Sequence, residues 1–208
     1  MQYALKLIKD DYVVGVTGSN GKTVVKEWIS QVMPSSVRLF RSPRSYNSQL
    51  GVALSLLMLD EDADVAIIEA GISKVGEMAR LERMIRPEIV IFTSLGDAHQ
   101  ENFETLQQKI DEKLLIAEDA KTIIYHGDYT ELAESIRQRY ADRELIDARG
   151  CEIEAQRDMA SQRNAACTVA FFRAMGYEEP DLSRLQQVSM RLELKEGIAN
   201  SLIIDDSY

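Results

Sequence analysis

Residues 14–28 read VGVTGSNGKTVVKEW, and this stretch decides the fold. The run YVVGVT at 12–17 is short, apolar and β-branched, which is typical of a buried parallel strand. After the glycines, apolar residues recur at helical spacing and predict an amphipathic helix over 22–33. This order of strand, turn and helix places the first turn of the helix beside the carboxyl end of the strand.

The glycine turn predicts a phosphate-binding loop. Glycines stand at 15, 18 and 21, and Lys22 and Thr23 follow, although Val16 takes the place of the first glycine of the strict GxxxxGK[ST] pattern. Backbone N–H groups of such a turn, together with the positive end of the following helix, favour phosphate. In such a loop Lys22 would reach the β- and γ-phosphates, and the Thr23 hydroxyl would bind Mg²⁺.

The rest of the chain repeats the alternation of strand and helix. Strands are predicted at 65–69 (VAIIE), 88–94 (EIVIFTS) and 121–127 (KTIIYHG), with helix-compatible segments between them. Right-handed crossovers then give an α/β fold, a mostly parallel sheet flanked by helices with the phosphate-binding loop at one edge. Ligands gather at the carboxyl ends of such strands, where the sequence places Thr17, Glu69 and the segment 93–99.

The pattern changes beyond about residue 143. Short strands are followed by a helix whose apolar face holds Cys167, Phe171 and Met175, and the tail predicts two strands, MRLELKEG and SLIIDDSY, around a turn at 197–200. Tyr208 follows a strand directly, without a cap or a polar tail. We therefore expect the chain to be a fragment of a longer protein.

Composition narrows the class of protein. Lys and Arg total 24 against 34 Asp and Glu, a net charge of −10 that argues against a nucleic-acid or membrane surface. The N-terminus lacks the features of a signal peptide, and no apolar run reaches the roughly 20 residues of a membrane span, so a cytoplasmic location is expected. Cys151 and Cys167 are interpreted as reduced thiols.

Three further residues are weighed as metal ligands. Glu69 ends an apolar strand and could bind Mg²⁺ through its carboxylate, the alternative being a surface charge. An isolated histidine such as His99 is more often structural than a ligand. Lys113 lies at the margin of the apolar stripe of the predicted helix over 106–114, and spacing alone indicates a surface lysine.

Several ordered motifs resemble those of the Mur ligases. They are GVTGSNGKTVVKEW, SYNSQLGVALSLL, IIEAGISKVGEMARLERMIRPEIVIFTSLGDAHQENF and RLELKEGIANSLIIDDSY, which cover nearly the whole chain. The resemblance implies the fold of the family's central ATP-binding domain, which is like that of P-loop NTPases, over residues 1–208. It also implies that the N-terminal UDP-sugar domain and the C-terminal domain of the family are absent here.

The same resemblance implies the roles of individual residues. Nucleotide contacts are implied for Gly18, Ser19, Asn20, Gly21, Lys22, Thr23, Asn164, Arg191 and Asp206. Catalytic roles are implied for Lys22, Asn47, His99 and Lys113, and metal ligation for Thr23, Glu69, His99 and Lys113. The implied cofactors are ATP, two Mg²⁺ ions and a carbamylated lysine at position 113. The adenine contacts are the weakest match, because Ala160 and Ser161 replace a His-Asn pair and His126 replaces an asparagine.

The resemblance is greatest to the branch that joins D-alanyl-D-alanine to UDP-N-acetylmuramoyl-tripeptide in peptidoglycan precursor synthesis. It implies that the complete enzyme is a monomer that activates a carboxylate as an acyl phosphate, which the amine then displaces. Two alternatives stay open. One is another amide ligase of the superfamily, such as the tripeptide-forming Mur ligase or a folylpolyglutamate synthase; the other is a non-catalytic nucleotide-binding module.

Overall fold

The predicted strands lie side by side in one six-stranded sheet. The computed structural model describes residues 12–151, 158–186, 188, 193–196 and 201–205. The strands of this sheet are β1 (Tyr12–Thr17), β2 (Leu39–Arg41), β3 (Val65–Glu69), β4 (Ile89–Phe92), β5 (Thr122–Tyr125) and β6 (Glu144–Asp147). Their order is β2-β3-β1-β4-β5-β6, and every neighbouring pair is parallel. The predicted mostly parallel sheet is confirmed.

β2 is not evident in the sequence. It has three residues, none of them fully buried, and it lies at the edge of the sheet, where it pairs with β3 only. A strand of this length carries too little period-two alternation to be separated from a loop.

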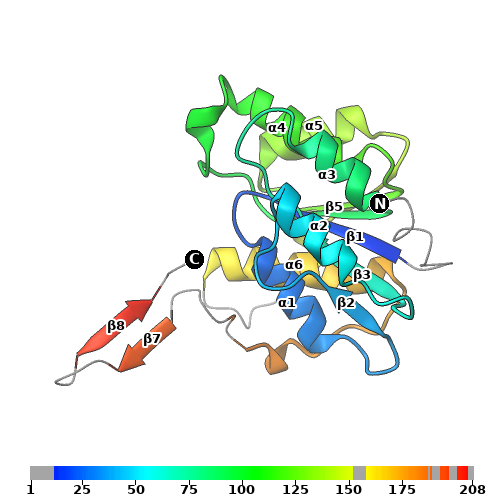
Figure 1. Ribbon diagram of the computed structural model, residues 1–208, viewed down its shortest axis with the longest axis vertical. Coiled ribbons are helices and arrows are strands. Elements are labelled where there is room, and N and C mark those ends of the chain that lie inside the picture. The colour runs from blue at the N-terminus through cyan, green and yellow to red at the C-terminus, as the bar shows by residue number, and fades with distance from the viewer. Residues whose placement is uncertain (1–11, 152–157, 187, 189–192, 197–200, 206–208) are drawn as a thin grey trace.

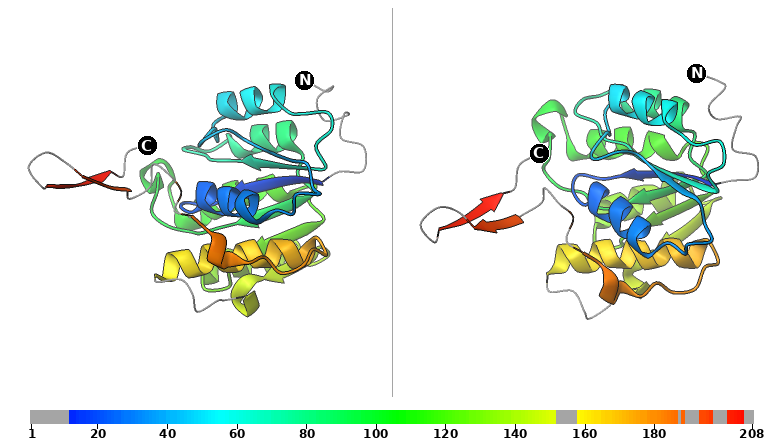
Figure 2. Two further views of the ribbon diagram at one scale, coloured as in Figure 1. Left: turned by 90° about the horizontal axis from the view of Figure 1, so that it is seen from below. Right: turned by 60° about the horizontal axis from the view of Figure 1, so that its bottom comes forward.

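Helices cover both faces of the sheet (Figures 1 and 2). They are α1 (Lys22–Val32), α2 (Gln49–Leu57), α3 (Met78–Ile85), α4 (Leu106–Leu114), α5 (Thr130–Arg139) and α6 (Met159–Ala174), with short 3₁₀ turns η2 (Gln100–Asn102), η3 (Leu115–Ala117), η4 (Ala148–Cys151) and η5 (Leu182–Arg184). The predicted helix over 22–33 is thus confirmed to within one residue. No helix in the described ranges combines the length and apolar character needed to cross a membrane.

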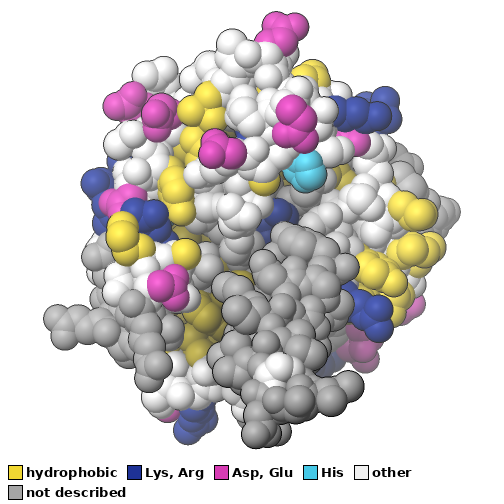
Figure 3. Space-filling model, turned by 90° about the vertical axis from the view of Figure 1, so that its left-hand side faces the viewer, with side chains coloured by type: hydrophobic (Ala, Val, Ile, Leu, Met, Phe, Trp, Pro, Cys, Tyr) yellow, Lys and Arg dark blue, Asp and Glu magenta, His cyan; other side chains and the backbone are white. Residues whose placement is uncertain are grey.

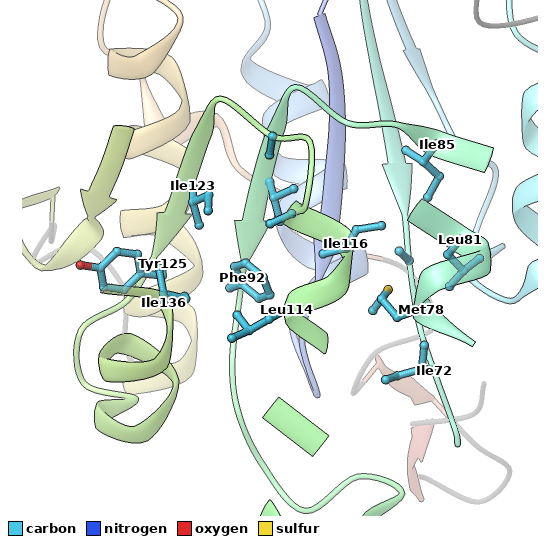
Figure 4. Packing of buried hydrophobic residues seen from close by; sticks show 14 of the residues in the cluster. Ile72, Met78, Leu81, Ile85, Phe92, Leu114, Ile116, Ile123, Tyr125 and Ile136 are labelled. Atoms are coloured by element: carbon cyan, nitrogen blue, oxygen red, sulfur yellow. The ribbon is translucent and has the colours of Figure 1, made fainter. Parts of the chain in front are cut away.

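The sheet separates two apolar cores. Alternate residues of β4 show this, because Val90 and Phe92 pack with α3, α4 and α5, whereas Ile89 and Ile91 pack with α1 and α6. Figure 4 shows the first of these cores, where side chains from α3, α4 and α5 meet those of β4 and β5. Burial of both faces explains why the strands read as continuous apolar runs.

The tail forms a separate two-stranded sheet. β7 (Glu193–Glu196) and β8 (Leu202–Asp205) pair antiparallel, with Glu193 opposite Asp205. This confirms the two predicted strands, whereas the turn predicted at 197–200 lies outside the described residues. Figure 1 shows the pair lying away from the six-stranded sheet.

A matched pair of leucines tests the division between core and surface. Leu81 in α3 is 0% exposed, and Leu57 in α2 is 82% exposed. We expect Leu81→Ala to lower the free energy of unfolding by about 2–5 kcal/mol, because it leaves a cavity, and Leu57→Ala to change it by less than about 0.5 kcal/mol. Urea unfolding followed by circular dichroism measures both. Equal losses in the two variants would contradict the position of α3 against the sheet.

Candidate functional site

The loops that follow β1, β3 and β4 meet at the carboxyl edge of the sheet. The Thr93 N–H donates to the Thr17 carbonyl at 2.8 Å, and the Ala70 N–H donates to the Val16 carbonyl at 2.8 Å. Parallel pairing therefore continues to the last residue of each strand and brings the three loops together. This edge is where the sequence places the candidate site.

Glycine is required at two positions of the loop after β1. Gly18 has a φ of 147°, and a Cβ atom there would lie 2.2 Å from the Thr93 Oγ1 atom. Gly21 has a φ of 82°, and a Cβ atom there would lie 2.4 Å from Oδ1 of Asn164. The second contact also places Asn164, in the second turn of α6, against the phosphate loop.

The loop is fixed by the segment that follows β4. The Ser19 N–H donates to the Ser94 carbonyl at 3.0 Å, and the Asn20 N–H donates to Ser94 Oγ at 2.7 Å. These two N–H groups therefore hold the loop in place, although the sequence led us to expect loop N–H groups directed at phosphate. The N-terminal turn of α1, which follows the N-cap residue Gly21, supplies further positive charge that favours a phosphate group.

Lys22 lies over this loop. Its Nζ atom donates to the carbonyl oxygens of Gly18 at 3.0 Å and Ser19 at 3.2 Å. An ammonium held there places positive charge at the mouth of the loop, which suits a phosphate group.

Glu69 is a fully buried charged group of the site. Its side chain is 0% exposed, and both carboxylate oxygens accept hydrogen bonds, Oε2 from the Thr23 hydroxyl at 2.9 Å and Oε1 from Asn47 Nδ2 at 2.8 Å. The alternative interpretation of Glu69 as a surface charge is therefore wrong, and the carboxylate lies beside Thr23, the residue that follows the phosphate loop and Lys22. Thr23 also lies 3.1 Å from the Ser45 hydroxyl.

Lys26 is a buried member of the same cluster that the sequence did not reveal. Its Nζ atom donates to the Ser42 carbonyl at 2.7 Å and to the Arg44 carbonyl, and it lies 3.8 Å from Glu69 Oε2. Burial lowers the pKa of Lys26, while the nearby Glu69 and Glu27 carboxylates act in the opposite direction. The signal that could have found it is its spacing, one helical turn beyond Thr23.

A cavity of about 610 Å³ opens above these groups. Its lining comes from four places: the phosphate loop with Lys22, the segment from Ser45 to Gln49, the segment from Gly71 to Ser73 with Glu77, and the group Ala98, His99 and Lys113. Figure 3 looks onto this side of the molecule, where basic, acidic and histidine side chains lie around a hollow. The structure thus brings Gly18, Ser19, Asn20, Lys22, Asn47, His99 and Lys113 to one cavity.

Lys113 is buried, which corrects the prediction of a surface lysine from helical spacing. It is 3% exposed, and its pKa falls from the ordinary 10.5 to about 7, first because of burial and then because of the charges of Lys22 and Lys109. Spacing failed because the margin of α4 borders the cavity formed with the loops after β1, β3 and β4, a tertiary arrangement that helical spacing does not encode. An amine with this pKa is largely neutral, and hence nucleophilic, just above neutral pH.

His99 lines the cavity from its rim. It is exposed, with a left-handed φ of 60° at the start of η2. Among the residues that the structure describes, no three side chains of His, Cys, Asp and Glu lie close enough to hold a metal ion by themselves. Mg²⁺ does not require such a cage, because it commonly uses one or two carboxylates, phosphate oxygens and water.

The remaining expected residues differ in how they are placed. Arg191 and Asp206 lie outside the described residues. Ala160 and Ser161 lie in the first turn of α6, and His126 is 0% exposed after β5. The geometry supports an anion-binding cavity with a buried carboxylate and hydroxyl beneath it and a neutral amine in its wall.

Comparisons with known proteins agree with this arrangement. The Mur ligase middle domain matches residues 16–172. UDP-N-acetylmuramoyl-tripeptide–D-alanyl-D-alanine ligase of Bacillus subtilis (strain 168) is 28% identical over an alignment that covers 94% of this chain and 49% of that protein. The chain therefore spans about half the length of this curated relative.

Two solved structures share the fold. MurF from Acinetobacter baumannii has a TM-score of 0.85 at 21% identity, over 99% of this chain and 52% of that one. MurF ligase from Thermotoga maritima, solved in complex with ADP, has a TM-score of 0.81 at 22% identity, over 100% of this chain and 56% of that one.

The depressed pKa of Lys113 predicts a pH dependence of stability. Between pH 7 and pH 10.5 the unfolded chain binds a proton at Lys113 that the folded chain does not, so the free energy of unfolding rises with pH. Across this window, we expect the free energy of unfolding of Lys113→Met to rise with pH less steeply than that of the wild type, by about 1.4 kcal/mol per pH unit. Urea unfolding in metal-free buffer purged of CO₂ at several pH values measures the difference. Parallel profiles for the two proteins would contradict the neutral amine.

Proposed function

The chain belongs to the Mur ligase family, and we propose that residues 1–208 form the central ATP-binding domain of a longer ligase. In this proposal the complete enzyme joins D-alanyl-D-alanine to UDP-N-acetylmuramoyl-tripeptide, the reaction that names its Bacillus subtilis relative. The observation that carries the proposal is the cavity in which Lys22 and the phosphate loop face Asn47 and Lys113. The UDP-sugar and C-terminal domains would lie outside these residues.

The proposed reaction has two steps. A substrate carboxylate oxygen attacks the γ-phosphorus of ATP, forming an acyl phosphate and releasing ADP. The amine nitrogen of the dipeptide then attacks the acyl carbon, the bond between that carbon and the phosphate oxygen breaks, and phosphate leaves while the amine loses its proton. The protein contributes positioning and electrostatic stabilisation, since the covalent chemistry occurs between substrates.

Named residues would divide this work. Lys22 and the N-terminal turn of α1 would balance the charge on the transferred phosphoryl group, with Gly18, Ser19, Asn20 and Gly21 shaping the loop. Asn47, held by Glu69 at 2.8 Å, would orient the acyl phosphate. Asn164 lies against Gly21 and would contact the nucleotide on that side, together with Arg191 and Asp206.

The residues present fit a bound Mg²⁺. The Thr23 hydroxyl and the Glu69 carboxylate lie 2.9 Å apart beneath the loop, and hard oxygen donors of this kind suit the ion. Mg²⁺ would neutralise phosphate charge at this end of the cavity. Glu69 and His99, together with a carbamate on Lys113, would hold a second ion.

The Lys22 ammonium should account for a large part of ATP binding. We expect Lys22→Ala to weaken binding of ATP with Mg²⁺ roughly 10- to 100-fold, because hydrogen bonds to charged groups contribute about 1.5–3 kcal/mol. Calorimetry on residues 1–208 measures this. Lys121→Ala is the matched control, because Lys121 pairs with Glu88 on the surface and lies outside the cavity lining. Equal affinity in the Lys22 variant and the wild type would remove Lys22 from the site.

We expect Lys113 to react with CO₂. The neutral amine nitrogen would attack the carbon of CO₂ and release a proton, leaving a carbamate. Nuclear magnetic resonance of protein incubated with ¹³C-bicarbonate, Mg²⁺ and ADP should show a carbamate carbon signal that Lys113→Met lacks. A wild-type spectrum identical to that of the variant would refute the modification.

The complete enzyme, and not residues 1–208 alone, should turn over. Holding the carboxylate, ATP and the amine together lowers the barrier by roughly 7–11 kcal/mol. Much of the protein surface that would hold the two substrates lies in the UDP-sugar and C-terminal domains of the proposed enzyme. We expect residues 1–208 to melt cooperatively yet release phosphate only at background. The complete polypeptide should release phosphate when UDP-N-acetylmuramoyl-tripeptide and D-alanyl-D-alanine are both present. Phosphate release by residues 1–208 alone, abolished by Lys22→Ala, would show that the active site is complete within them. Phosphate release by the complete polypeptide without the two substrates would contradict the proposed ligase activity.

A further inference from the structure

The cavity has opposite charges on its walls. Among its described lining residues, Lys22 and Lys113 are the basic side chains and Glu77 is the one carboxylate. Glu77 is absent from the roles proposed above. An acidic group on the wall of a cavity that binds anions requires its own explanation, since it would repel phosphate.

The Glu77 carboxylate is held in one orientation. Its Oε2 atom accepts hydrogen bonds from the Ser73 N–H at 2.7 Å, the Ser73 hydroxyl at 3.1 Å and the Lys74 N–H at 3.1 Å. Partial burial opposes ionisation, but these bonds outweigh it and lower the pKa of Glu77, so the group is charged at neutral pH. Within the described part of the chain, none of the hydrogen bonds to Glu77 goes to Oε1.

The backbone on both sides of Glu77 is anchored to the helix that carries Lys113. The N–H groups of Gly76 and Met78 donate to Glu112 Oε1 at 2.9 and 3.0 Å. Glu112 is 6% exposed and immediately precedes Lys113 in α4. This bridge fixes the position of Glu77 relative to the amine of Lys113, and both residues line the same cavity.

From this placement we propose that Glu77 is the binding site for the ammonium group of the amine substrate. The inference rests on the proposed ligase function and specifies where its second substrate enters. An α-amino group has a pKa of about 7.7–8.0 and is largely an ammonium at neutral pH, so it requires an anionic acceptor. The lowered pKa makes Glu77 a binding group and not the base that removes the proton.

A divalent metal ion is a poorer fit for this wall. Such an ion prefers several oxygen ligands with negative charge. Glu77 offers Oε1, because Oε2 already accepts three hydrogen bonds, and the carbamate proposed on Lys113 would be used by the ion beside His99. A single ammonium requires one charged acceptor and neutral oxygens, which the hydroxyl and amide groups of Ser48, Gln49 and Ser73 can supply.

The test compares a cationic nucleophile with a neutral one in the complete ligase. Glu77→Gln retains an oxygen that can accept from Ser73 and Lys74 but removes the charge. We expect the KM for D-alanyl-D-alanine to rise roughly tenfold or more, with the KM for ATP within about twofold of wild type. Hydroxylamine is neutral at pH 7.5 and traps the acyl phosphate as a hydroxamate, and its rate should be the same in both proteins. Glu134→Gln, on an exposed position of α5, is the matched control.

Each contrary result has a distinct meaning. Hydroxamate formation by the wild type together with an unchanged dipeptide KM in Glu77→Gln would overturn the ammonium site alone. Equal loss of both nucleophiles would show a structural role, and a raised Mg²⁺ requirement would show a metal ligand; either would overturn it. No hydroxamate from the wild type would overturn the ligase function and this site together.

A measurement on the wild type does not depend on the variant folding. The 2-hydroxy analogue of the dipeptide, in which a hydroxyl replaces the ammonium, should inhibit with an affinity roughly tenfold or more below that of the amine. Equal affinity for the two compounds would overturn the proposal.

Discussion

The buried carboxylate of Glu69 is the constraint on which the site depends. A fully buried charge costs several kcal/mol unless it is paired and hydrogen-bonded, and the bonds to Glu69 come from two directions. Thr23 reaches it from the first turn of α1, and Asn47 reaches it from the loop before α2. Lys26 lies 3.8 Å away and also binds the carbonyls of that loop. Satisfying one carboxylate therefore aligns the phosphate loop, the end of β3 and the segment that carries Asn47.

The fold was predictable where local pattern and tertiary context agree. β1, β3 and α1 follow from β-branched runs and helical spacing, because both faces of the sheet are buried. β2 has three residues, and its pairing with β3 depends on the chain returning to the sheet edge after α1. That return is a property of the whole fold, and no short stretch of sequence encodes it.

The site was predictable to a different extent. The glycine spacing indicated the loop, and parallel strands required Glu69 to lie beside it. Burial of Lys113 was not predictable from spacing, because it depends on η3 and on the neighbouring loops. Glu77 gave no signal, since a glutamate before a helix is ordinarily a surface residue. Its place in the cavity wall depends on the hydrogen bond from the Gly76 N–H to Glu112, two residues that are 36 positions apart in the sequence.

The chain carries a net charge of −10, yet Lys22 and Lys113 line its cavity. Burial and the positive charges of Lys22 and Lys109 lower the pKa of Lys113 to about 7. Phosphate bound at the loop would offset the charge of Lys22 and so raise the pKa of Lys113, which disfavours the neutral amine. A carbamate would place a second negative charge in the same cavity and repel that phosphate. A cation between them would offset both charges, which gives a physical reason for the second Mg²⁺ proposed beside His99 and Lys113.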